Sequence, residues 1–263
     1  MNQEKFRLWD LPTRLFHWTL VVAAVAAIVS GQLGGNLIEW HGRIGLFIFG
    51  LLAFRLAWGV VGSTYARFRQ FLPTPVKIAA YLRGEWHGAG HNPLGALSVF
   101  GLLALLTAQV GSGLFANDDI TFVGPLFDLV GKNLSNRLTG IHYLLSNAIY
   151  VLIALHIAAI AFYARVRKQK LVKPMLTGWK DGAGESATGG GALALILALA
   201  VAGAAVYGAS GAWLPAPPPP PAAAETPNWR DGPRPAGDEA PRDRQGIGAA
   251  ISCPWLERPA AGS

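Results

Sequence analysis

Five long apolar stretches constrain this chain more than any other feature of its sequence. They cover approximately Leu15–Leu33, His41–Val61, Leu94–Phe115, Ile141–Tyr163 and Ala192–Leu214. A helix needs roughly 20 apolar residues to cross the hydrocarbon core of a bilayer. The apolar residues run continuously and do not alternate with polar ones, so helices are indicated rather than the strands of a barrel. The sequence therefore predicts an all-α protein that crosses the lipid bilayer.

The composition agrees with a membrane location. Charged residues make up 14 % of the chain, whereas soluble domains average about 25 %. The net charge of +7 does not indicate nucleic acid as a partner, because basic residues gather directly after the fourth apolar stretch, where cytoplasmic anchoring charge is typical: Arg165, Arg167, Lys168, Lys170 and Lys173. A single cysteine, Cys253, excludes an internal disulfide, a thiolate-bound iron–sulfur cluster and a structural cysteine–zinc site.

The loop charges also predict an orientation. The connection over residues 62–93 is basic, whereas the connection over residues 116–140 carries Asp118, Asp119 and Asp128. Lys and Arg favour the cytoplasmic side, so we expect a cytoplasmic N-terminus and a tail on the outer face. Tryptophans at both ends of the stretches suggest an aromatic belt, with three of them at the inner boundary: Trp9, Trp18 and Trp58.

Composition shifts divide the chain into four segments. Residues 1–181 contain the first four apolar stretches and are expected to form a four-helix membrane bundle. Glycine-rich residues 182–191 are expected to form a flexible linker. Residues 192–214 are expected to form a fifth transmembrane helix, and residues 215–263 a disordered Pro-rich tail.

Four of the six histidines lie in the apolar stretches, where ionisable side chains are rare and often functional. His142 and His156 are separated by 14 positions on one predicted helix, which is about 21 Å of rise and nearly four turns. Both therefore face the same way, at opposite depths. With alternating helix directions, His17 pairs in depth with His156 near the inner face, and His41 pairs with His142 near the outer face.

Two imidazoles at equal depth on facing helices are a typical axial ligand pair for a haem iron. The four histidines therefore predict two non-covalent haem b groups, one bound by His17 and His156 and the other by His41 and His142. Bare metal ions are a poorer match, since each pair lacks a carboxylate or thiolate ligand. A proton relay is also a poorer match, because the apolar stretches contain no deep carboxylates to share the proton. His87 and His91 lie outside the apolar stretches and are expected at the surface.

Arginines near these histidines could bind haem propionates. Arg14 lies about one turn before His17, and Arg55 lies 14 residues after His41, at the depth of the inner iron. Two more flank the outer pair: Arg43 and Arg137. Arg14 and Arg137 could equally extend to the membrane interface. Arg55 is less easily explained that way, because an unpaired arginine at that depth is costly.

The motifs "WDLPTRLFHW", "WHGRIGLFIFGLLAFRLAWGVVG", "GHNPLGAL", "IHYLLSNAIYVLIALHIAAI" and "VKPMLTGWK" resemble the bacterial cytochrome b561 and nickel-dependent hydrogenase b-type cytochrome family over roughly residues 5–180. The resemblance implies a four-helix membrane bundle with two b-type haems, each bound by two histidines. His17, His41, His142 and His156 match the ligand positions. It also implies electron transfer in the inner membrane, between a quinone pool or a periplasmic carrier such as a cytochrome c and a partner.

Three functions stay open at this point. The first is a stand-alone dihaem electron carrier in the respiratory chain. The second is the membrane-anchor subunit of a larger oxidoreductase, such as a hydrogenase. The third is a histidine-dependent ion or proton transporter, but internal repeats and broken helices with deep carboxylates, which such transporters often have, are not found. A small bundle of this type could also form a homodimer.

Overall fold

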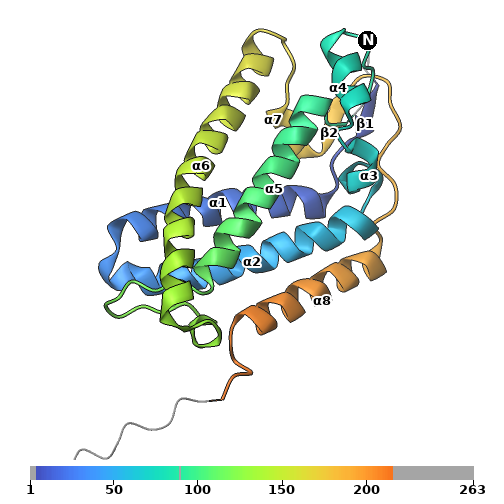
Figure 1. The fold of residues 1–263 in the computed structure, drawn as a ribbon. Helices are drawn as coiled ribbons and strands as arrows, with labels where there is room; N and C mark the ends of the chain where they lie inside the picture. Colours follow the sequence, from blue (N-terminus) through green and yellow to red (C-terminus); the bar gives the residue numbers. More distant parts are fainter. Residues whose placement is uncertain (1–3, 89, 216–263) are drawn as a thin grey trace, which may run out of the picture. The chain divides into compact units, whose positions relative to one another are not determined.

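A computed structural model describes residues 4–88 and 90–215, so most of the predicted Pro-rich tail lies outside the described residues. Its long helices are α1 (Leu11–Leu33), α2 (Ile38–Val61), α5 (Pro93–Gly113), α6 (Gly131–Arg165) and α8 (Ala192–Ala209) (Figure 1). All five are long and apolar enough to cross a membrane. The all-α transmembrane prediction is therefore confirmed. Successive helices run in opposite directions, which gives the bundle an N-terminal end, where α1 begins, and a far end, where α1 finishes.

Shorter elements join the long helices. Two of them are strands, β1 (Lys5–Arg7) and β2 (Trp179–Asp181), which pair antiparallel with Phe6 opposite Lys180. This strand pair departs from the purely helical expectation. The others are η1 (Gly35–Leu37), η2 (Thr64–Ala66), α3 (Phe68–Phe71), α4 (Pro75–Leu82), η3 (Phe127–Leu129) and α7 (Val172–Thr177). Most of these short elements belong to the N-terminal end, where they connect the spans.

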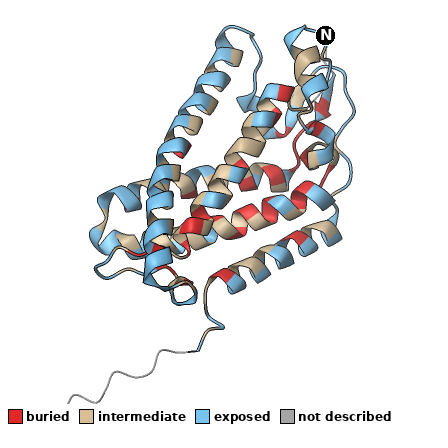
Figure 2. Cartoon of the chain, in the orientation of Figure 1, coloured by how far each residue is buried: buried red, intermediate tan, exposed pale blue. Residues whose placement is uncertain are grey.

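Helix α2 is the centre of the packing. It packs most extensively against α8 and then against α1, and it also contacts α5, which in turn packs against α6. A Cβ at Gly50 of α2 would lie 2.7 Å from a methyl group of Val206, so the lack of a side chain allows α8 to approach α2 closely. Figure 2 shows buried residues concentrated along α2, whereas α6 is largely exposed. Large apolar side chains on α6, including Leu144 and Val151, are among those exposed, as expected for a lipid-facing helix.

Asp10 fixes the start of α1. Its Oδ1 accepts a hydrogen bond from the Thr13 backbone N–H at 2.8 Å, and its Oδ2 accepts one from Trp58 Nε1 at 2.9 Å. A cap of this kind stabilises a helix by about 1 kcal/mol. Trp58 is fully buried and Trp9 is 6 % exposed, so neither belongs to a lipid-facing aromatic belt. That interpretation was wrong for these two residues because a polar group on the protein, not the membrane surface, receives the Trp58 N–H.

The segment over residues 182–191 is hydrogen-bonded to other parts of the chain along its length, although its composition indicates a flexible linker. The Ala187 N–H donates to the Arg7 carbonyl at 2.7 Å, and the Thr64 N–H donates to the Thr188 carbonyl at 2.8 Å. These bonds hold the segment against β1 and η2, so α8 begins at the N-terminal end of the bundle. Helix α8 finishes at Ala209 rather than at Leu214.

Candidate functional site

His41 and His142 lie together at the far end of the bundle. Helix α2 supplies His41 and α6 supplies His142, and their ring centroids are 5.9 Å apart with an angle of 86° between the ring planes. Two imidazoles that share one metal ion at nitrogen–metal distances of about 2 Å have centroids roughly 6 Å apart. The separation of the two rings therefore suits a single ion between them.

Main-chain carbonyls orient both imidazoles. His41 Nδ1 donates to the Ala27 carbonyl of α1 at 2.8 Å, and His142 Nδ1 donates to the Gln109 carbonyl of α5 at 2.9 Å. When Nδ1–H is donated in this way, Nε2 carries the lone pair that binds a metal. Each imidazole is thus set by a helix other than its own, and together the four helices α1, α2, α5 and α6 define this pair.

Two glycines make room for these rings. A Cβ at Gly31 of α1 would lie 2.9 Å from His41 Nδ1, and a Cβ at Gly113 of α5 would lie 2.9 Å from His142 Cε1. Such distances are too short for real side chains, so both positions need glycine. In the sequence these glycines are indistinguishable from those that permit ordinary helix packing.

Gln109 is a polar residue near the far-end pair that the sequence interpretation missed. Its side-chain Nε2 donates to His142 Nε2 at 3.0 Å, so this amide would have to turn away for His142 to bind an iron, and its Oε1 is enclosed without a hydrogen-bond partner among the described residues. The available signal was a glutamine inside the apolar stretch 94–115. Its position beside His142 required the packing of α5 on α6.

The other two histidines lie toward the N-terminal end. His17 on α1 has an enclosed Nδ1 without a partner among the described residues, and His156 on α6 has its Nδ1 3.4 Å from Ser98 Oγ of α5. This pair is more loosely arranged than the far-end pair, but the same helices, α1, α5 and α6, contribute to it.

The residues fit haem better than a bare metal ion. Over residues 4–88 and 90–215 there is no group of three or more His, Cys, Asp or Glu side chains that could hold a metal. His41 and His142 would hold a haem through their imidazole nitrogens, and the porphyrin would supply the other nitrogens to the iron, so no third protein ligand would be needed. The ring separation of His41 and His142 and the two glycines beside them are compatible with that ligand set.

The four candidate arginines differ in their surroundings. Arg55 on α2 is 4 % exposed, donates from Nη1 to the Ala66 carbonyl at 3.2 Å, and lies 4.6 Å from the centre of the Phe68 ring. Arg14 donates to the Leu176 carbonyl, and its Nε is enclosed without a partner in the part of the chain that the structure describes. Arg55 and Arg14 therefore place cationic groups inside the N-terminal end.

The arginines at the far end are both exposed. Arg43 forms an ion pair with Glu39, at 3.5 Å, and lies over the Trp40 ring. Arg137 lies on the exposed surface of α6. Gln109, Gly31 and Gly113 lie against one of the two imidazoles, His41 or His142. Neither arginine does.

His91 does not lie free at the surface as expected, although His87 does. The His91 ring is held between Trp9, at a centroid distance of 4.7 Å, and Phe71, at 4.6 Å. Its Nδ1 is shielded from solvent and has no hydrogen-bond partner in the described part of the chain. Burial, with the nearby charges of Arg55 and His156, lowers the pKa of His91 to about 3. The imidazole is therefore neutral at physiological pH.

The comparison with protein families agrees with this arrangement. The family model for prokaryotic cytochrome b561 matches residues 8–178, a range that includes all four histidines of the two pairs. No curated protein and no solved structure matches the chain. With long apolar helices that hold paired imidazoles, the fold and the site define a membrane b-type cytochrome, a protein that binds b-type haem and takes part in electron transfer. The chain belongs to the prokaryotic cytochrome b561 family.

Proposed function

We propose that this protein is a dihaem cytochrome b that carries electrons across the inner membrane of a bacterium, between a quinone pool and a redox partner. When bound, each haem supplies an iron that takes up and releases one electron. His17 and His156 bind the haem nearer the N-terminal end, and His41 and His142 bind the one nearer the far end. The observation that carries this proposal is the His41–His142 pair, with a ring separation of 5.9 Å and both Nδ1 atoms bonded to main-chain carbonyls.

The charge distribution supports a cytoplasmic N-terminus. The basic segment after α6, which includes Arg167 and Lys168, and the basic α2–α5 connection both belong to the N-terminal end of the bundle. The α5–α6 connection at the far end carries Asp118 and Asp119. By the preference of Lys and Arg for the cytoplasm, the far-end haem and the C-terminal tail then belong to the periplasmic side. Residues 1–181 form the dihaem bundle, and α8 with the tail is an addition beyond the part that matches the family.

Haem content and potentiometry test the proposal. Protein purified in detergent is expected to contain about two haem b groups per chain, measured by the pyridine haemochrome assay against protein mass. A redox titration of the reduced-minus-oxidised spectrum is expected to show two steps. A single step with about one haem per chain would contradict the dihaem assignment while leaving family membership intact.

Arg55 is expected to raise the potential of the N-terminal-end haem. An Arg55→Gln variant should lower that potential, because the oxidised iron carries one more positive charge and a nearby cation disfavours it. About 1 kcal/mol of lost interaction corresponds to about 40 mV for one electron. Potentiometric titration measures the shift, and the step assigned to the far-end haem should not move.

The matched control for this variant is Arg83→Gln. Arg83 also belongs to the α2–α5 connection, but it is exposed and paired with Glu85 at 3.0 Å. Equal shifts in the two variants would mean that general surface charge, not Arg55, sets the potential.

A further inference from the structure

Two serines of α5 repeat the spacing of the two histidines of α6. Ser98 and Ser112 are separated by 14 positions, as are His142 and His156, and this separation is nearly four helical turns. Because α5 and α6 pack together in opposite directions, each serine meets one histidine. Ser98 Oγ lies 3.4 Å from His156 Nδ1, and Ser112 Oγ lies 3.4 Å from His142 Nδ1. The α5–α6 interface therefore places a hydroxyl group beside each imidazole of α6.

The two hydroxyl groups do not have the same role. His142 Nδ1 donates to the Gln109 carbonyl at 2.9 Å, and the Ser112 hydroxyl donates to the same carbonyl at 2.8 Å. His156 Nδ1 has no main-chain acceptor of this kind, since Ser98 Oγ is its one hydrogen-bond partner within residues 4–88 and 90–215. His156 thus depends on a side chain for the bond that His142 receives from the main chain.

The acceptor at Nδ1 determines how His156 can act as a ligand. When Nδ1–H is donated to the Ser98 oxygen, Nε2 carries the lone pair that binds a metal. The same bond makes the imidazole a more basic ligand, and a more basic ligand stabilises the oxidised iron more than the reduced iron. Hydrogen bonds of this kind are one of the means by which a protein sets a haem potential.

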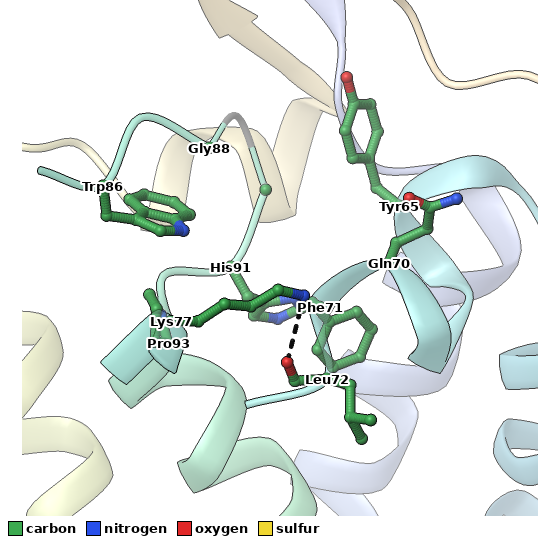
Figure 3. Close-up of a pocket in the computed structure, with 10 residues that line it drawn as sticks. Tyr65, Gln70, Phe71, Leu72, Lys77, Trp86, Gly88, His91 and Pro93 are labelled. Atoms are coloured by element: carbon green, nitrogen blue, oxygen red, sulfur yellow. Dashed lines mark hydrogen bonds between the residues drawn. The ribbon is translucent and has the colours of Figure 1, made fainter. Parts of the chain in front are cut away.

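Other polar groups at the N-terminal end do not make this contact. His91 lies beside Phe71 in the wall of a cavity of about 230 Å³ in the α2–α5 connection, where ring contacts hold it (Figure 3). Arg55 donates to a main-chain carbonyl. His17 Nδ1 has no hydrogen-bond partner in the described part of the chain. Among the described residues, Ser98 is therefore the one whose side chain hydrogen-bonds to an imidazole of the N-terminal-end pair.

We propose that Ser98 is a positioning residue for His156: its hydroxyl accepts the Nδ1–H hydrogen bond and thereby lowers the potential of the N-terminal-end haem. This inference rests on the proposed binding of that haem by His17 and His156. It gives the two haems different controls, because a replaceable hydroxyl acts on one and main-chain carbonyls act on the other. The residue at position 98 can therefore change one potential without changing the other.

The test measures the potential of the N-terminal-end haem in a His142→Ala parent, so that a single haem is titrated. Ser98→Ala should raise this potential and change the ratio of reduced to oxidised haem at a fixed potential about threefold, which is about 30 mV for one electron. Ser98→Thr keeps a hydroxyl and should retain the potential of the parent. Ser98→Cys keeps the size of serine but offers a weaker acceptor, so it should also raise the potential.

Thr107→Val in the same parent is the matched control. Thr107 lies on α5, and its hydroxyl donates to the Leu103 carbonyl of the same helix at 2.7 Å. The substitution therefore removes a hydroxyl from α5 that has no hydrogen bond to a histidine in the part of the chain that the structure describes, and the potential should equal that of the parent.

Three outcomes would contradict the inference. If Ser98→Ala and Ser98→Cys keep the potential of the parent with the haem bound, or if Ser98→Thr raises it as far as Ser98→Ala does, the role of Ser98 is wrong, although the dihaem function stands. An equal rise in Thr107→Val would also overturn that role, because any change in α5 would then act alike. A His156→Ala variant that keeps both haems would instead contradict the ligand assignment of the proposed function, and this inference would fall with it.

Discussion

A His142→Ala variant is expected to purify with about one haem per chain instead of about two. Its imidazole is bonded through Nδ1 to the Gln109 carbonyl, and its ring centroid lies 5.9 Å from that of His41, so under the proposed assignment its removal would leave His41 as the one histidine holding the far-end haem. A haem held by one imidazole in place of two would be bound more weakly, and its visible spectrum would change because the axial ligands set its properties. The pyridine haemochrome assay and the reduced-minus-oxidised spectrum measure both effects.

Paired variants make this expectation sharper. His41→Ala should remove the same spectral component as His142→Ala, and His17→Ala should remove the same component as His156→Ala. His87→Ala is the control, since this histidine is exposed and belongs to neither pair. Loss of one common component in His17→Ala and His41→Ala would show that the ligands are paired differently.

A Gly113→Val variant is expected to lose the far-end haem without any change to a ligand. A Cβ at this position would lie 2.9 Å from His142 Cε1 and 3.1 Å from its Nδ1, so the imidazole must turn away or α5 must move from α6. Either movement breaks the bond between His142 Nδ1 and the Gln109 carbonyl. The haem content should fall toward one per chain, and the remaining haem should keep the potential of the N-terminal-end site.

Gly111→Val tests whether position, rather than the loss of any glycine, is responsible. Gly111 lies on the same helix, and nothing lies within 4 Å of a Cβ built there. This variant should keep both haems. Haem loss in both variants would mean that α5 tolerates no branched residue in this region and that contact with the His142 imidazole is not the cause.

Most of the fold could be predicted from the sequence because its signals are local. A continuous apolar stretch of about 20 residues indicates a transmembrane helix whatever its neighbours are, and five helices of this kind are present. Helical periodicity likewise places His142 and His156 on one face of α6. The β1–β2 pair was missed because each strand has only three residues and the two lie far apart in the sequence.

The surroundings of the histidines could not be predicted, because they depend on tertiary packing. The spacing of histidines predicts two pairs, and the structure places His41 beside His142. No local pattern shows that Gln109 lies next to His142, or that Gly31 and Gly113 differ from other glycines. His91 was expected at the surface because the sequence around it, "WHGAGHNP", is polar and glycine-rich. Its partial burial results from Trp9 and Phe71, which come from two other parts of the chain.

His41 Nδ1 and His142 Nδ1 both donate to main-chain carbonyls. The two hydrogen bonds are therefore tolerant of point substitutions at the acceptor positions but sensitive to changes in helix length. A peptide oxygen is present whichever amino acid occupies position 27 or 109, so point substitutions there leave the acceptor in place. A single-residue insertion or deletion within α1 or α5 acts differently, because it rotates the helix beyond it by about 100° and carries the acceptor out of reach. Evolution of this site is therefore expected to accept changes in amino-acid identity at position 27, whose side chain takes no part in the bond, far more readily than changes in the length of α1 and α5.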